Sequence, residues 1–317
     1  MGVDAGSGPD GTVEHGAGIE ALARRVPGWV DLALVVVSID AGITNRNYKV
    51  TLPDGTAWML RLPGERTEVL GIDRACEAEA AARADALDIG PPVLGLLPGV
   101  GTLVTRFLPG GHVTDPVAFA ARLPEVVPLL RRFHASGPIA GRFPIFRVVE
   151  WHERDARANG VPTPAGFEAL HERARAVERA FAAAPTAPVP CHNDLLPANV
   201  LFDGERAWLL DWEYAGMNDP WFDLGNLAVN AQLDTDAERR LLELYAGAVT
   251  PARWARLQLM KIMSDFREGM WAVVQQGIST LTTIDFVAYA DEHLERCRTR
   301  FAHPDAERWI ADAALPI

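Results

Sequence analysis

The pattern of apolar residues changes once along this chain, near Pro109-Gly110-Gly111, and the change limits the fold to two unlike parts. An alanine-rich segment in the first part, 74–88, lacks glycine and proline and stops before Gly90-Pro91, as helices do. The same part holds five short apolar runs typical of β-strands, at 33–39, 46–52, 57–62, 93–97 and 101–107. The predicted order is β-β-β-α-β-β, with the five strands in one antiparallel sheet.

Helical periodicity dominates beyond this point, in the segments 116–134, 165–184, 236–247, 251–276 and 284–301. One exception is 200–211, where two apolar runs flank Asp203-Gly204, a hairpin pattern. We therefore predict an α+β chain with two lobes. Residues 19–106 form a small β lobe that contains one helix, and residues 107–317 form a larger, mainly helical lobe. Lobes of this kind leave a cleft where ligands bind. The glycine-rich residues 1–18 are expected to form a flexible leader.

Length and charge narrow the classes of function. Single cores usually begin to split near a length of 317 residues, which agrees with two lobes. The net charge of −12 argues against nucleic acid and anionic membranes as partners and suits a small cationic substrate. The chain has no long apolar run, so no membrane span is expected. Its three cysteines lack the spacing of a disulfide framework or zinc site, which favours a cytoplasmic location.

The strongest chemical signal is the segment CHNDLLPAN (191–199), which has the H-x-D-x4-N form of a kinase catalytic loop. In that pattern Asp194 would accept the proton of the attacking hydroxyl, and Asn199 would hold a metal ion. Phosphoryl transfer needs the acceptor in line with the γ-phosphorus and Mg²⁺ to neutralise the phosphate oxygens. One short loop can place both groups. The alternative is a polar capping loop.

Two acidic residues follow the predicted hairpin. Asp211 ends the apolar run 209–211, where a kinase fold presents its second metal-binding carboxylate. A helix cap or a surface ion pair is the commoner role of such a residue. Glu213 lies two residues further on, and the pattern leaves open whether it contacts a metal-bound water or caps the loop.

The run LLDWEYAGMNDPWFDLGN (209–226), together with 191–199, resembles the signature of the choline/ethanolamine kinases. These kinases lie in the aminoglycoside-phosphotransferase branch of the protein-kinase-like fold. The resemblance spans roughly 33–301 and includes the blocks GITNRNYKV (42–50), WMLRLPG (58–64) and MWAVVQQGIS (270–279). It implies a two-lobed protein-kinase-like fold and a transfer of phosphate from ATP, with Mg²⁺, to an alcohol.

The resemblance also implies residues for the nucleotide. The segment 42–48 corresponds to the loop over the ATP phosphates, with Asn45 and Asn47 as hydrogen-bond donors. Arg61 would grip the phosphates with its guanidinium fork. Glu77 would hold Arg61, although helix spacing alone does not separate Glu77 from Glu79.

Further roles follow from the same resemblance. The segment from Thr105 to Leu108, which includes Phe107, matches the hinge whose backbone would bind adenine. Asp223 would brace the catalytic loop from a following helix, without touching the substrate.

The resemblance places the substrate's ammonium group among Trp271, Tyr289 and acidic side chains, because aromatic faces attract cations. Core packing is the alternative for either aromatic residue. The sequence departs from the family twice: Glu268 stands where many members have tryptophan, and Asn230 where an acidic residue is common. A carboxylate favours amines that donate hydrogen bonds, so ethanolamine gains on choline.

Asp265 fits either a further acidic pocket residue or a solvated helix face. Three histidines, His152, His171 and His293, are expected at the surface. Together these patterns predict an ATP- and Mg²⁺-dependent kinase of a small cationic alcohol, choline or ethanolamine above all. The alternatives are an aminoglycoside phosphotransferase and a nucleotide-binding regulator without catalysis. Whether the chain acts alone or as a homodimer stays open.

Overall fold

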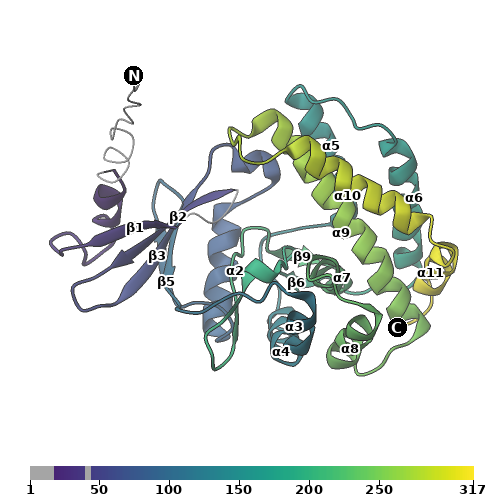
Figure 1. Cartoon of the computed structure of the whole chain (residues 1–317), viewed down its shortest axis with the longest axis horizontal. Helices are drawn as coiled ribbons and strands as arrows, with labels where there is room; N and C mark the ends of the chain where they lie inside the picture. The colour runs from purple at the N-terminus through teal and green to yellow at the C-terminus, as the bar shows by residue number, and fades with distance from the viewer. Residues whose placement is uncertain (1–17, 40–43) are drawn as a thin grey trace, which may run out of the picture. The chain divides into compact units, whose positions relative to one another are not determined.

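A computed structural model describes residues 18–39 and 44–317 of the chain. Most of the predicted leader (1–18) and the start of the predicted phosphate loop (42–43) lie outside the described residues. The chain divides into two compact units (Figure 1). One contains the chain up to residue 65 together with 92–108, and the other contains 66–91 and 109–317. The alanine-rich helix therefore belongs, by its contacts, to the second unit.

The first unit is built on one antiparallel sheet with the strand order β1-β2-β3-β5-β4. Its strands are β1 (Val35–Ile39), β2 (Asn45–Thr51), β3 (Ala57–Pro63), β4 (Val93–Leu97) and β5 (Thr102–Arg106). One face is apolar: Val50, Leu60 and Leu62 pack against Trp29 and its neighbours before β1. Because side chains alternate along a strand, Arg61 lies on the opposite face. The predicted five-stranded antiparallel sheet is confirmed.

The second unit is mainly helical and is organised around one long helix, α9. Four helices, α5, α7, α10 and α11, pack on α9 (Figure 1). The helices are α2 (Arg74–Ala86), α3 (Pro116–Ala121), α4 (Leu123–His134), α5 (Ile145–Ala158), α6 (Phe167–Ala183), α7 (Pro220–Asn230), α8 (Thr235–Ala246), α9 (Pro251–Ile278), α10 (Phe286–Phe301) and α11 (Ala306–Ala313). Charged side chains recur along α9, and no helix of the described residues is apolar over a membrane's width.

Short strands in this unit carry the loops that the sequence singled out. The predicted hairpin is present as β7 (Val200–Phe202) and β8 (Ala207–Leu209), and β6 (Val189–Cys191) pairs with β9 (Gly216–Asn218). Two 3₁₀ turns, η1 (Thr67–Leu70) and η2 (Pro197–Asn199), complete the elements. Sequence reasoning missed β6 and β9, because three residues are too few to show an alternation.

Close packing of α7 on α9 depends on Gly225. A Cβ atom at this position would lie 2.6 Å from the backbone carbonyl carbon of Met260, far inside van der Waals contact. Every residue of α7 except the last is buried, so the helix shows no polar face and its apolar period is obscured. The periodicity of the sequence therefore gave no sign of α7, and only the family resemblance implied a helix at Asp223.

We expect Gly225→Ala to lower the free energy of unfolding by more than about 2 kcal/mol, because the methyl group must push two helix backbones apart. Urea unfolding monitored by circular dichroism measures the change. Gly111→Ala is the matched control, since a Cβ atom at Gly111 meets nothing within 4 Å. Equal stability of the two variants would contradict this account of the α7–α9 contact.

The histidines differ from the sequence expectation. His152 on α5 and His293 on α10 are buried, whereas His171 is half-buried. Both were predicted at the surface because polar neighbours surround them in sequence, yet the faces that bear them turn toward α9. Burial, reinforced by the positive charge of Arg267, lowers the pKa of His152 to about 3.

This burial predicts a pH dependence of stability. The unfolded chain binds a proton at His152 near pH 6.5, whereas the folded chain does so only near pH 3, so stability falls as the pH drops between these values. Urea unfolding should show a loss of about 2 kcal/mol from this group between pH 6.5 and pH 5. His152→Gln should remove that slope, while substitution of the exposed His303 should leave it. An unchanged slope in His152→Gln would contradict the assignment.

Candidate active site

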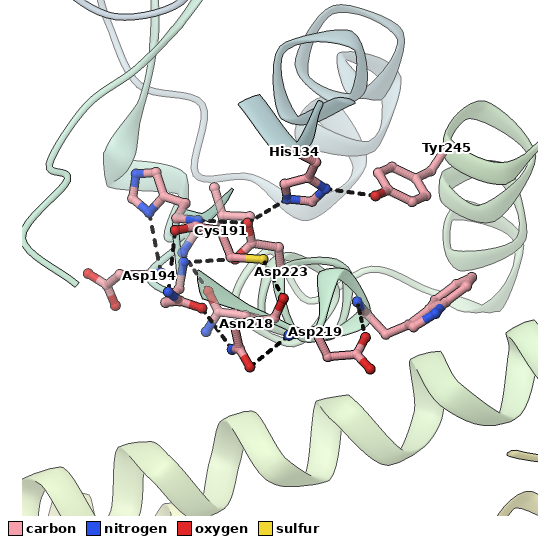
Figure 2. Close-up of polar contacts among 12 residues, drawn as sticks. His134, Cys191, Asp194, Asn218, Asp219, Asp223 and Tyr245 are labelled. Atoms are coloured by element: carbon pink, nitrogen blue, oxygen red, sulfur yellow. Dashed lines mark hydrogen bonds and ion pairs between the residues drawn. The ribbon is translucent and has the colours of Figure 1, made fainter. Parts of the chain in front are cut away.

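The loop that follows β6 is held by Asp223, which lies fully buried in the first turn of α7. Its Oδ1 accepts a hydrogen bond from the backbone N–H of Asn193 at 2.7 Å, and its Oδ2 accepts one from that of His192 at 2.8 Å (Figure 2). The side chain of Asp219 caps α7 by accepting from Trp221 N at 2.9 Å, which fixes where the helix begins. Asp223 thus holds the backbone of this loop, and its importance for catalysis stays a prediction.

A second layer of contacts surrounds Asp223. His134 Nε2 lies 2.9 Å from Asp223 Oδ2, and its Nδ1 lies 2.7 Å from the Tyr245 hydroxyl (Figure 2). His134, Cys191 and Asp223 form a group of three potential metal ligands within the described residues. Burial raises the pKa of the Cys191 thiol well above its usual value, which favours the neutral thiol over the thiolate that binds metals. We therefore interpret this group as a hydrogen-bonded brace.

Asn193 sets the turn that presents Asp194. Its φ of 65° is left-handed, a conformation that asparagine tolerates better than most residues. Its Nδ2 donates to Tyr214 O at 2.9 Å, and its Oδ1 accepts from Asn218 Nδ2 at 2.8 Å. Asn226 adds a further contact by accepting from Leu195 N. The sequence analysis did not single out Asn193, Asn218 or Asn226, because a lone asparagine gives no distinctive pattern.

The predicted catalytic and metal-binding residues meet at this turn. Asn199 Nδ2 donates to Asp194 O at 2.8 Å and to Asp194 Oδ2 at 3.2 Å. The backbone N–H of Leu210 donates to Asn199 O at 2.9 Å, which places Asp211 beside the same loop. Burial raises the pKa of Asp194 to about 8, with Arg267 opposing the rise and the negative charges of nearby carboxylates adding to it: Glu268, Asp211 and Glu213.

This cluster fits a divalent cation. Carboxylate and amide oxygens are the ligands that Mg²⁺ prefers, and Asp211 and Asn199 supply one of each. Repulsion from neighbouring carboxylates adds to the effect of burial on the pKa of Asp194, and a bound cation would reduce this repulsion. The donor set therefore agrees with the predicted metal-binding role of these two residues.

Glu77 and Glu213 share one arginine. Arg74 Nη1 lies 2.7 Å from Glu77 Oε2 and 3.4 Å from Glu213 Oε2. Both glutamates are buried, and Arg74 was not predicted. The predicted pair of Glu77 with Arg61 connects residues of different units and stays a prediction, as do the two roles left open for Glu213.

The predicted acceptor residues on α9 and α10 lie together. The rings of Trp271 and Tyr289 are 6.0 Å apart, edge to face. Tyr289 Oη donates to Glu268 Oε2 at 3.4 Å, and Trp271 Nε1 donates to Tyr214 Oη at 3.0 Å. Glu268 also pairs with Arg267, which in turn lies 3.4 Å from Asp194 Oδ1. Arg267 connects the acceptor residues to the catalytic loop, and the sequence analysis did not identify it.

Two residues considered for the acceptor pocket have other contacts. Asn230 Nδ2 donates to Leu195 O at 3.5 Å, so it supports the backbone of the catalytic loop. Asp265 is fully buried and pairs with Arg296 at 2.9 Å and Arg300 at 3.0 Å. The solvated helix face considered for Asp265 is therefore wrong.

The predicted nucleotide residues of the first unit lie on one face of its sheet. Asn47 lies directly opposite Arg61 in the β2–β3 register, and Asn45 shares their face. Thr105 lies opposite Met59, so it also faces away from the apolar side. The backbone N–H of Phe107 donates to Ala57 O. Of the two backbone groups of Phe107, the carbonyl is therefore the one that could bind a ligand. The binding of a nucleotide by these residues stays a prediction.

The two backbone hydrogen bonds that Asp223 accepts can be tested by substitution. Asp223→Asn replaces a carboxylate that accepts from two backbone N–H groups by an amide with a single acceptor oxygen, so the unfolding free energy should fall by about 2–4 kcal/mol. Phosphotransferase activity should fall with it, because Asp194 loses its support. Thermal unfolding and turnover of the same preparation test both effects. Asp203→Asn, in the turn of the β7–β8 hairpin, is the control, and equal effects of the two variants would contradict the role of Asp223.

Comparisons with known proteins agree with this geometry. Residues 35–260 match the phosphotransferase enzyme family. The chain is 30% identical to LicA of Haemophilus influenzae over 211 residues, which cover 64% of this chain and 60% of LicA. It is 32% identical to ethanolamine kinase 2 of Mus musculus over 121 residues, which cover 32% of this chain and 31% of that kinase. The chain thus spans less than two thirds of the length of these two relatives.

Structural similarity extends over nearly the whole chain. A choline/ethanolamine kinase family protein from Mesorhizobium loti superposes with a TM-score of 0.81 at 30% identity, over 94% of this chain and 99% of that one. The predicted α+β, protein-kinase-like fold is confirmed by this match. The chain therefore belongs to the phosphotransferase enzyme family, in its choline/ethanolamine kinase branch.

Proposed function

We propose that this chain is an ATP- and Mg²⁺-dependent kinase that transfers the γ-phosphoryl group to the hydroxyl of choline, ethanolamine or a related amino alcohol. The observation that carries the proposal is the direct contact of Asp194 with Asn199, beside Asp211, in a loop braced by Asp223. Ethanolamine kinase 2 and LicA are among the relatives. We place the reaction in the cytoplasm, where ATP is available.

Asp194 orients the acceptor. Its carboxylate receives the hydroxyl proton while the acceptor oxygen bonds to the γ-phosphorus and the bond to the β-phosphate oxygen breaks, which releases ADP. Asn199 and Asp211 would hold Mg²⁺, which neutralises charge on the phosphate oxygens. Because the transition state is loose, placement and charge supply most of the catalysis.

The phosphates of ATP would meet Arg61, with Asn45 and Asn47 donating from the adjacent strand and the segment from Thr105 to Phe107 holding the adenine. The shared sheet face of Asn45, Asn47 and Arg61 supports this assignment. A guanidinium fork suits phosphate oxygens.

The acceptor's ammonium group would lie against Trp271 and Tyr289, with Glu268 and Asp194 supplying negative charge. The edge-to-face packing of the two rings and the contact of Tyr289 with Glu268 support a single pocket. Cations are attracted to aromatic faces, most strongly in a desolvated site.

The proposal is tested by ATP consumption with Mg²⁺ against choline, ethanolamine, its monomethyl and dimethyl derivatives, and an aminoglycoside. Turnover that depends on an amino alcohol is the expected result. Turnover with the aminoglycoside alone would support an antibiotic phosphotransferase instead. Binding of MgATP without any turnover would indicate a regulator.

Asp194→Asn separates chemistry from binding. We expect turnover to fall by at least about 10²-fold, because proton transfer by a positioned base contributes at least that much. MgATP should still raise the midpoint of thermal unfolding, since the nucleotide contacts assigned above do not use Asp194. Loss of the MgATP-induced shift would contradict the role of Asp194 as a base.

A further inference from the structure

Arg267 is a fully buried cation inside the proposed acceptor site. It lies on α9, only 1% of its surface is exposed, and its guanidinium carbon lies 4.3 Å from the ring centre of Tyr214 and 5.7 Å from that of Phe143. Two of its nitrogens, Nε and Nη2, are buried without a hydrogen-bond partner in the described residues. The guanidinium thus depends on aromatic faces and carboxylates for its stabilisation.

Two carboxylates compensate its charge. Nη1 of Arg267 contacts both Glu268 Oε1 and Asp194 Oδ1, the latter at 3.4 Å. The other oxygens are also engaged, because Glu268 Oε2 accepts from Tyr289 and Asp194 Oδ2 accepts from Asn199. Both carboxylate oxygens of Glu268 therefore already have partners within the protein.

The charges in this cluster have a direct consequence for the substrate. When Asp194 is ionised, as it must be to accept a proton, one guanidinium and two carboxylates leave a local charge of −1, where the two carboxylates alone would give −2. The guanidinium also covers one aromatic face, that of Tyr214, which a substrate cation could otherwise approach. A second cation entering the pocket meets repulsion that low-dielectric surroundings screen poorly.

We propose that Arg267 is a resident cation of the acceptor site with two effects: it positions the carboxylate of Asp194, and it weakens the binding of the substrate's ammonium group. The inference rests on the proposed function. It makes Arg267 a positioning and specificity-determining residue, although it touches no reacting atom. Arg267 thus reduces the affinity for the acceptor and fixes the orientation of the Asp194 carboxylate.

Arg267→Met tests both effects, since methionine fills a similar volume without charge. Calorimetry should show about tenfold tighter binding of choline, because a nearby positive charge is gone. In the same variant kcat should fall at least about tenfold, because Asp194 loses an orienting contact. KM and kcat thus fall together, a combination that loss of structure alone does not produce.

Two comparisons isolate the charge. Arg267→Lys keeps the charge but not the fork, so choline should bind as in the parent enzyme while kcat stays reduced. The neutral carbon analogue of choline, which carries carbon in place of the ammonium nitrogen, should bind Arg267→Met and the parent enzyme equally. Tighter binding of this analogue to the variant would overturn the electrostatic account.

Arg256→Met is the matched structural control. Arg256 is a second fully buried arginine of α9, and it contacts Phe181, the carbonyl oxygens of Ala184 and Ala313 and, at 3.9 Å, Asp219 Oδ2. Its replacement should lower stability without changing the affinity for choline. If Arg267→Met and Arg256→Met leave that affinity equally unchanged, the inference is wrong. If the parent enzyme phosphorylates no amino alcohol, the proposed function fails instead.

Discussion

The rest of the site depends on one carboxylate accepting two consecutive backbone N–H groups. Asp223 holds the N–H groups of His192 and Asn193, and this contact fixes the left-handed turn that presents Asp194. The close packing of α7 on α9 at Gly225 fixes the position of α7, and with it the position of the Asp223 carboxylate. Packing between two helices thus helps to fix the position of Asp194, the base in the proposed reaction, because the contacts of Asp223 with the loop are short and buried.

The electrostatics of the site are balanced by arginines. Burial raises the pKa of Asp194, and repulsion from the carboxylates of Glu268, Asp211 and Glu213 adds to that rise. Arg74 pairs with Glu77 and Glu213, and Arg267 pairs with Glu268 and Asp194. Arg74 and Arg267 thus supply positive charge to four of the buried acidic side chains around the loop: Glu77, Glu213, Glu268 and Asp194.

The sequence predicted those elements of the fold that show a periodic pattern or a turn signal over a few neighbouring residues. The five strands and the hairpin at 200–211 each show a period or a turn signal, and the spacing of Asp194 and Asn199 is fixed within one loop. The periodicity could not reveal α7, because burial on all sides removes the amphipathic pattern, and only the family resemblance implied a helix at Asp223. The burial of His152 and Asp265 could not be predicted either, because it depends on contacts between helices that are distant in sequence. The partners of Asp265, Arg296 and Arg300, come from another helix.

Arg267 shows why the acceptor pocket is harder to predict than the chemistry. The catalytic residues are constrained by the phosphoryl group, which is the same for every member of such a family, whereas the pocket is constrained by the rest of the substrate. The departure at Glu268 was visible in the sequence, and alone it suggested an added negative charge. Its neighbour Arg267 supplies the opposite charge, so the two residues act as one buried pair. An acidic residue in a binding pocket therefore indicates an attraction for cations only after its partners are known.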